Sequence, residues 1–280
     1  MSLVVSIMAQ GGMGAATAAR LVAGGVEVRT ITEGRSAASA ERAAKAGMRS
    51  VSEDEFAQAD FILSIVPPAE AIPLAKRLAP ALMRVNRKPI YVDLNAINPN
   101  TVMMVEMIVA PSRCHFVDGG IIGLPPRADG YSPVYYVAGP EAEKVTALRE
   151  YGLKISVLEG PVGAASALKM SYAGITKGLI GLAASMILAA HRAGISEALY
   201  AELGVSQQNL LASFRRTVPD MFGKAGRWVA EMEEIAAFAG GDARAEGDMY
   251  AALARFYERV GNDFAGPKAE IELLKSFFPE

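Results

Sequence analysis

The chain has 280 residues, 51% of them hydrophobic, a length that exceeds one ordinary small core and fits two domains. Its 28 basic and 30 acidic residues give a net charge of −2 without a basic patch, which excludes nucleic acid and an anionic membrane surface as expected partners. One cysteine and two histidines exclude an internal disulfide, argue against a metal site, and favour a reducing, cytoplasmic compartment.

Two apolar segments bear on targeting. The N-terminal segment lacks a basic region ahead of its first apolar run, so we do not expect a signal peptide. The most apolar window, residues 178–190, is too short to span a bilayer and is bounded by Lys177 and Arg192. We therefore expect this window to be a buried helix.

The chain begins with a dinucleotide-binding pattern. Residues 3–9 are apolar and rich in β-branched side chains, which predicts a parallel strand buried on both faces. The turn QGGMG at residues 10–14 follows, and residues 15–24 predict a helix. The backbone N–H groups of such a turn bind a pyrophosphate at the helix N-terminus. The match to G-x-G-x-x-G is partial, because Ala9 replaces the first glycine, and glycine turns also occur for structural reasons alone.

The second predicted strand, residues 27–32, ends where this type of fold contacts the adenosine ribose. Arg35 and Ser36 suit a 2′-phosphate through charge-assisted hydrogen bonds and stacking, which predicts NADP(H). Glu33 is an acid that would instead favour the free 2′-hydroxyl of NAD(H). A solvated loop charge is the alternative interpretation of Arg35.

Strands and helices then alternate as far as residue 158, which predicts a doubly wound parallel sheet with ligands at the carboxyl ends of its strands. Val66, Pro67 and Pro68 end one strand, because proline cannot continue a ladder, and they form either a stiff ledge under the cofactor or a simple terminator. The predicted strands are 61–66, 90–94, one that begins at 115–117 and ends at the block 118–123, 134–138 and 154–158. The predicted helices are 37–47, 69–83, a helix from about Thr101, and 141–151.

Residues 160–192 predict one helix about 50 Å long, around which the second half of the chain is organised. Large apolar side chains recur at steps of four and three, which places them on one face: Leu168, Tyr172, Ile175, Leu179, Leu182 and Met186. We expect Tyr172, as a member of this stripe, to be a core residue. Lys169 lies among alanines and glycines near the start. It either extends to water or faces a cleft at the domain junction and exchanges a proton, and the dinucleotide features favour the second.

The remaining chain has no strand pattern. It predicts helices at residues 196–203, 207–216, 228–239, 243–260 and 267–278, with Pro219 as an interruption. We therefore expect a Rossmann domain at residues 1–160 and an all-α domain at 161–280. The apolar surplus favours a homodimer through the helical domain.

Five blocks occur in order: AQGGMG, EGRS, VPP, DLNAINP with DGGIIG, and GPVGAASALKMSYAG. Together they resemble the β-hydroxyacid dehydrogenase superfamily, whose relatives include 6-phosphogluconate and 3-hydroxyisobutyrate dehydrogenases. The resemblance covers nearly the whole chain. The last block is also similar to a less characterised NADP-binding branch.

The resemblance implies an NADP-dependent oxidoreductase that transfers hydride to or from a small hydroxyacid or alcohol, with Lys169 as general acid/base. It implies cofactor contacts by Gln10, Gly11, Gly12, Met13, Gly14, Arg35, Ser36, Val66, Pro67, Pro68 and Asn95. It implies substrate contacts by Gly119, Gly120, Ile121, Ile122, Gly123, Ala173 and Lys177. It also implies a helical second domain that forms dimers.

Two residues depart from the superfamily pattern. Ile122 stands where the substrate-loop serine is usual, and Ala173 stands where an asparagine is usual. Both changes make the predicted pocket more apolar, so a reductase of another C=X bond, such as an imine, is an alternative. A non-catalytic NADP sensor is a third hypothesis, which the retained Lys169 disfavours because a sensor needs no proton donor.

Overall fold

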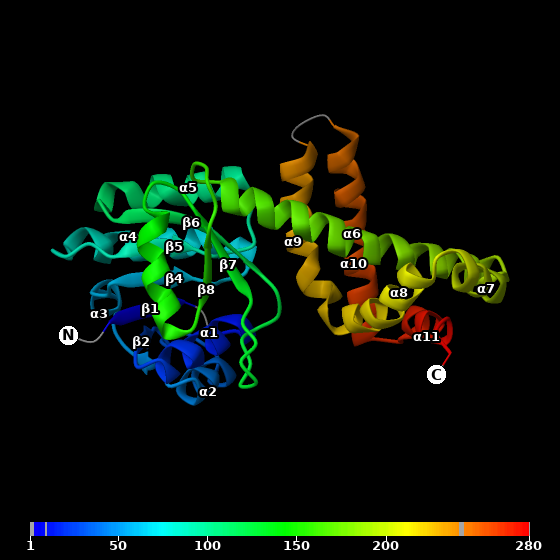
Figure 1. Cartoon of the computed structure of the whole chain (residues 1–280), viewed down its shortest axis with the longest axis horizontal. Coiled ribbons are helices and arrows are strands. Elements are labelled where there is room, and N and C mark those ends of the chain that lie inside the picture. Colours follow the sequence, from blue (N-terminus) through cyan, green and yellow to red (C-terminus); the bar gives the residue numbers. More distant parts are fainter. Residues whose placement is uncertain (1–2, 9, 241–243, 280) are drawn as a thin grey trace. The chain divides into compact units, whose positions relative to one another are not determined.

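The computed structural model describes residues 3–8, 10–240 and 244–279, and Ala9 lies outside this described part. The chain divides into two compact units, Met1–Met170 and Ser171–Glu280. Each has its own architecture: the first is built on a β-sheet and the second consists of helices (Figure 1).

The first unit contains one eight-stranded sheet of order β3-β2-β1-β4-β5-β6-β7-β8. The strands are β1 (Val4–Met8), β2 (Glu27–Thr30), β3 (Arg49–Ser50), β4 (Phe61–Ser64), β5 (Ile90–Asp93), β6 (His115–Ile122), β7 (Val134–Ala138) and β8 (Lys154–Val157). This order confirms the predicted doubly wound α/β class. One detail of that prediction is wrong, because β7 runs antiparallel to β6 and carries β8 with it. The connection between β6 and β7 has no helix, and a parallel return requires a crossover element.

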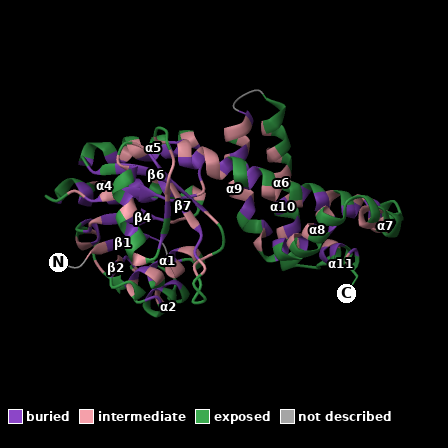
Figure 2. Ribbon diagram, viewed as in Figure 1, coloured by how far each residue is buried: buried purple, intermediate pink, exposed green. Residues whose placement is uncertain are grey.

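Helices cover both faces of this sheet (Figure 1). On one face α1 (Gly12–Ala23), α2 (Ala37–Lys45) and the 3₁₀ helix η3 (Ala142–Tyr151) pack against alternate strand residues such as Val5 and Ile7. On the other face lie α3 (Glu53–Ala57), α4 (Ala71–Arg84) and α5 (Pro99–Val109). The central strands β1, β4, β5 and β6 are buried between these two layers (Figure 2), as the continuous apolar runs in the sequence require.

Four local predictions differ from the structure. Strand β3 and helix α3 were not predicted, because each is shorter than the sequence periods that reveal such elements. The predicted helix at 141–151 is a 3₁₀ helix. Strand β6 continues through Ile122, so the residues expected to form a substrate loop are mostly strand.

The second unit is all-helical. It contains most of α6 (Ala164–Arg192), followed by α7 (Ser196–Ser206), α8 (Gln208–Met221), α9 (Ala225–Gly240), α10 (Ala245–Ala265) and α11 (Ala269–Ser276). The interruption predicted at Pro219 is wrong, because α8 runs through it to Met221. Pro219 lies in the last turn of α8, two residues before the helix ends, and a short 3₁₀ helix, Phe222–Lys224, follows.

The buried face of α6 in this unit is its small-residue face. Gly174 and Gly178 lie against Tyr250, and a Cβ on Gly181 would be 2.8 Å from Leu253 Cδ2. Helix α10 therefore approaches the backbone of α6 more closely than larger side chains would permit.

The predicted apolar stripe faces outward. Its members in the second unit are exposed: Tyr172 (49%), Ile175 (69%), Leu179 (41%), Leu182 (57%) and Met186 (55%). Tyr172 was expected to be a core residue, and that prediction is wrong. Periodicity identified the apolar face correctly, but packing within the chain uses the glycine face.

Helix α6 is also the one candidate membrane span among the described residues. It is 29 residues long, with an 18-residue window of mean hydropathy 1.6, so the expectation that the apolar segment is too short to span a bilayer is wrong by length and composition. The core helix of a soluble protein passes the same test. Of that window 39% is buried, so the expectation of a buried helix holds only for the glycine face that packs against α10.

Candidate dinucleotide and proton-transfer site

The predicted site residues of the first unit gather at one edge of the sheet. Strands β1, β4, β5 and β6 are parallel, with Met8 opposite Ser64, Ser64 opposite Asp93, and Asp93 opposite Asp118. The segments that follow these strands therefore meet at the carboxyl edge, where doubly wound sheets bind ligands.

The glycine turn after β1 is open to a ligand. Helix α1 starts at Gly12, its N-cap Gly11 makes no side-chain capping bond, and no acid lies in the first turn. A Cβ on Gly11 or Gly12 would have no neighbour within 4 Å, and neither residue has positive φ. Neither packing nor conformation requires glycine here, whereas close approach of a pyrophosphate to the backbone does. This turn, with Met13 and Gly14 in the first turn of α1, therefore fits a dinucleotide.

Gln10 points into the protein from the same turn. Its side chain is fully buried, and Nε2 donates to Thr30 Oγ1 at 2.6 Å and to the Ile31 carbonyl at 2.8 Å. Its own carbonyl accepts a hydrogen bond from Arg42 Nε, and its Oε1 has no partner. These bonds tie the glycine turn to the end of β2, where the ribose is expected.

The ribose end combines an exposed Arg35 with a structural Ser36. Ser36 is the N-cap of α2, and its Oγ accepts a hydrogen bond from the Ser39 N–H at 3.3 Å. Arg35 lies at a small pocket of about 100 Å³ that the sequence did not reveal as a unit. The residues that line it are Met8, Arg35, Val66, Pro67, Glu70, Pro73, Leu74 and Arg77. Arg35 and the proline ledge thus share one hollow.

Asn95 supports that ledge from the end of β5. The residue is 2% exposed, and its Oδ1 accepts a hydrogen bond from the Val66 N–H at 2.6 Å. Its Nδ2 donates to Ser64 Oγ at 2.8 Å and to Asp93 Oδ2 at 2.9 Å. The predicted cofactor residue is therefore bonded on both sides of its carboxamide within the protein.

Lys169 is held against the end of β6. Its Nζ donates to the Ile121 carbonyl at 2.8 Å, and the side chain is partly buried. A Cβ on Gly120 would lie 2.9 Å from the Cβ of Lys169 and 3.1 Å from the Ala165 carbonyl. Glycine at position 120 is therefore required for β6 to lie this close to the start of α6.

The start of α6 is capped by Asp118, the first residue of the DGGIIG block, for which the sequence did not predict a capping role. Its carboxylate is fully buried in β6 and accepts hydrogen bonds from the N–H groups of Gly163, Ala165 and Ser166 and from Ser166 Oγ. Burial raises the pKa of this carboxyl, and the four donors oppose the rise. The cap fixes the first turn of the helix that carries Lys169.

The other predicted substrate residues in β6 and just after it pack against neighbouring parts of the protein. A Cβ on Gly119 would lie 2.6 Å from Leu94 Cδ2, and Gly123 has φ +131°. Ile121 is buried and provides the carbonyl for Lys169, whereas Ile122 is half-buried at the strand end. Ile122 is thus the apolar side chain of this strand that remains partly accessible.

Two predicted substrate residues belong to the second unit. Ala173 is buried. Lys177 forms an ion pair with Glu231, and its Nζ lies 5.1 Å from the centre of the Trp228 ring. Burial lowers the pKa of Lys177, and the attraction of Glu231 opposes that effect. Lys177 therefore has a structural partner within its own unit.

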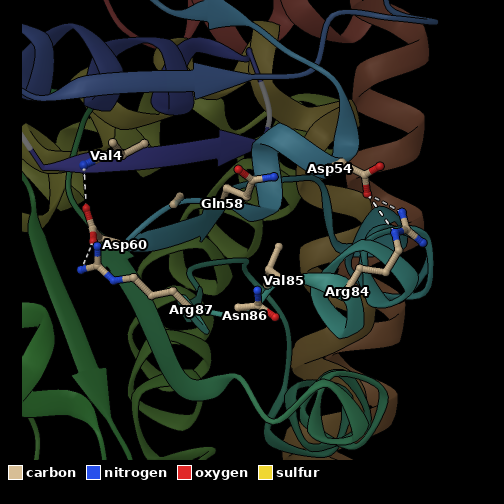
Figure 3. A pocket seen from close by; sticks show the side chains of 9 residues that line it. Val4, Asp54, Gln58, Asp60, Arg84, Val85, Asn86 and Arg87 are labelled. Carbon is tan, nitrogen blue, oxygen red and sulfur yellow. Dashed lines mark hydrogen bonds and ion pairs between the residues drawn. The ribbon is translucent and has the colours of Figure 1, made fainter.

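A larger hollow, of about 800 Å³, lies at the opposite, amino edge of the sheet (Figure 3). Asp60, just before β4, accepts the Val4 N–H and pairs with Arg87. Asp54 and Arg84 form a second ion pair. Both arginines are already neutralised, and ligands of this fold bind at the other edge, so we do not assign the site here.

Comparisons with known proteins identify the family of the chain. Residues 5–151 match the family described as the NAD binding domain of 6-phosphogluconate dehydrogenase, and residues 190–260 match a domain of unknown function, DUF1932. An uncharacterized 28.5 kDa protein of Methanothermus fervidus is 30% identical over 176 residues, which are 62% of this chain and 66% of that protein.

Solved structures share the fold across both units. A conserved protein of unknown function, described as structurally similar to 3-hydroxyacid dehydrogenases, is 29% identical with a TM-score of 0.73, covering 97% of this chain and 99% of its own. The 3-hydroxyisobutyrate dehydrogenase of Mycobacterium tuberculosis is 20% identical with a TM-score of 0.73, covering 98% and 100%. Imine reductases also have this fold. Because the first family match spans more than half of the chain, the protein belongs to the family that carries the 6-phosphogluconate dehydrogenase type of NAD-binding domain, a family of nicotinamide-dependent oxidoreductases.

Proposed function

We propose that the protein is an NADP-dependent oxidoreductase that interconverts a small hydroxyacid or alcohol and its carbonyl form, with Lys169 as general acid/base. The observation that carries this proposal is the fixed position of the Lys169 ammonium at the Ile121 carbonyl, on the same sheet edge as the open glycine turn. A bound nicotinamide cofactor would supply the hydride.

Residues of the chain would bind the cofactor, position it and transfer the proton. The N–H groups at the start of α1 bind the pyrophosphate, and Arg35 binds the 2′-phosphate at the end of β2. The Asn95 carboxamide holds the ledge at Val66. Lys169 donates a proton to the substrate oxygen in reduction and accepts it in oxidation.

An imine-type reductase is the second candidate. Ile122 places an apolar, partly accessible side chain at the end of β6, where a hydroxyacid site would benefit from a hydroxyl. Turnover of cyclic imines without turnover of short 3-hydroxy acids or their carbonyl forms would favour this reading over the first.

The role of Arg35 gives a cofactor test. We expect Arg35→Ala to weaken NADPH binding about 10- to 100-fold and to leave NADH binding nearly unchanged, because a charge-assisted hydrogen bond contributes about 1.5–3 kcal/mol. Isothermal titration with both cofactors measures this, with Arg87→Ala at the opposite edge as the matched control. Equal loss for both cofactors would refute the 2′-phosphate role, and a wild type that binds neither would end the enzyme proposal.

We also propose that the protein is a homodimer through the exposed apolar face of α6, formed by Tyr172, Ile175, Leu179, Leu182 and Met186. We expect Leu182→Arg to convert a dimer to a monomer, as measured by light scattering. Val205→Arg, at a 79% exposed position on α7, is the control and should leave the mass unchanged. A monomeric wild type would contradict the proposal.

A further inference from the structure

The Asn95 carboxamide is fully engaged inside the protein. A primary amide has two N–H donors, and Asn95 directs them to Ser64 Oγ and to Asp93 Oδ2. Its oxygen accepts the Val66 N–H at 2.6 Å. A direct amide donor bond to a cofactor would therefore break one of these contacts, so the side chain acts on the ledge.

The orientation of this amide is set by Asp93. That carboxylate is 1% exposed and accepts twice from Asn95, from the backbone N–H at 3.0 Å and from Nδ2 at 2.9 Å. An ionised carboxylate can only accept, so it selects the NH₂ side of the amide. The amide oxygen then faces Val66 and accepts a hydrogen bond from its backbone N–H.

We propose, on the basis of the function proposed above, that Asp93 and Asn95 are positioning residues for the cofactor. Asp93 orients the Asn95 carboxamide, and the carboxamide holds Val66 and Pro67 where they line the hollow shared with Arg35. The cofactor then meets the ledge itself, and Asp93 acts on binding through two intervening residues.

The electrostatic surroundings of Asp93 make this role sensitive to pH. Burial raises the pKa of Asp93 to about 7, the charge of Asp118 on β6 adds to the rise, and the bonds from Asn95 oppose it. Tyr91 on the same strand is buried, and burial together with the charge of Asp93 raises its pKa above the ordinary value. Burial raises the pKa of Glu106 on α5, and repulsion by the Asp118 carboxyl adds to the rise.

The contribution of Asp93 to folding stability and its contribution to cofactor binding should respond to pH in opposite directions. The pKa of Asp93 is higher in the folded state than in the unfolded chain, so its contribution to stability is fully present at acid pH and is lost as pH rises through about 7. Asp93, Asn95 and Val66 together form a hydrogen-bonded clamp. The clamp needs the ionised carboxylate of Asp93, because a protonated carboxyl would present its own donor to the N–H donors of Asn95. A purely structural role would not produce opposite signs.

The decisive variant is Asp93→Asn in the full-length chain, which keeps the shape and removes the charge. At pH about 8 we expect NADPH affinity about tenfold weaker than in wild type, with an unfolding free energy equal to or above that of wild type. As pH falls from about 8 to about 6, the affinity of wild type should fall towards that of the variant. Titration of the ligand's own 2′-phosphate is common to both proteins and cancels in the comparison.

Two further variants complete the test. Asn95→Ala should weaken binding similarly, and combining it with Asp93→Asn should add little, because both act through one clamp. Asp60→Asn, a carboxylate that accepts the Val4 N–H at the opposite edge, should leave NADPH affinity unchanged. Wild-type affinity and pH dependence in Asp93→Asn would overturn this inference alone. Failure of wild type to bind NADPH or NADH would overturn the proposed function together with it.

Discussion

Replacement of Lys169 by methionine will lower turnover about 10²- to 10⁴-fold and leave NADPH affinity within about twofold of wild type, because a positioned proton donor contributes that factor to the rate. Methionine keeps the aliphatic stem that packs against Gly120 and removes only the ammonium that donates to Ile121. Oxidation of a panel of short 3-hydroxy acids, followed by NADPH absorbance, measures the rate, and isothermal titration measures the affinity.

Lys154→Met provides the matched control. This lysine starts β8 and is exposed, so the substitution removes the same charge from the same unit without touching α6. We expect its turnover and affinity to equal those of wild type. Near-normal turnover in the Lys169 variant would refute the general acid/base role. Cofactor binding would then be the only function proposed for the carboxyl edge of the sheet.

The sequence predicted those features of the fold and the site that short runs of neighbouring residues encode. The apolar strand runs, the glycine turn and the proline ledge all lie where expected at one sheet edge, because parallel strands bring their carboxyl ends together. The direction of β7 was not predictable in the same way. Strand direction depends on the route of the connection after Ile122, and no residue pattern in that loop specifies it.

The site residues that the sequence missed act through tertiary contacts. Asp118 caps a helix that begins 46 positions later, and Asp93 orients an amide that bonds to Val66 in the segment after β4. Asp93 and Asn95 are only two residues apart, but the role of the pair depends on the distant Val66, and the cap by Asp118 depends on the distant start of α6. The burial of the α6 glycine face had a visible signal, the spacing of Gly174, Gly178 and Gly181, but the larger side chains on the other face dominated the periodicity.

The second large effect is expected at Asp118. Asp118→Ala leaves the N–H groups of Gly163, Ala165 and Ser166 without their buried acceptor, and the unfolding free energy should fall by about 3–5 kcal/mol. Urea unfolding measures the loss. The matched control is Ser52→Ala, an exposed N-cap on α3 that accepts one bond from the Glu55 N–H at 3.3 Å and should cost about 1 kcal/mol or less.

Asp118→Asn separates stability from catalysis. Its amide oxygen can still accept from the helix N-terminus, so the stability loss should be smaller than in the alanine variant, while the loss of the negative charge weakens the cap at the positive end of α6. Because that end carries Lys169 one turn further on, we expect the variant to bind NADPH normally and to turn over more slowly. A variant with wild-type turnover and reduced stability would show that Asp118 stabilises the fold without positioning the lysine.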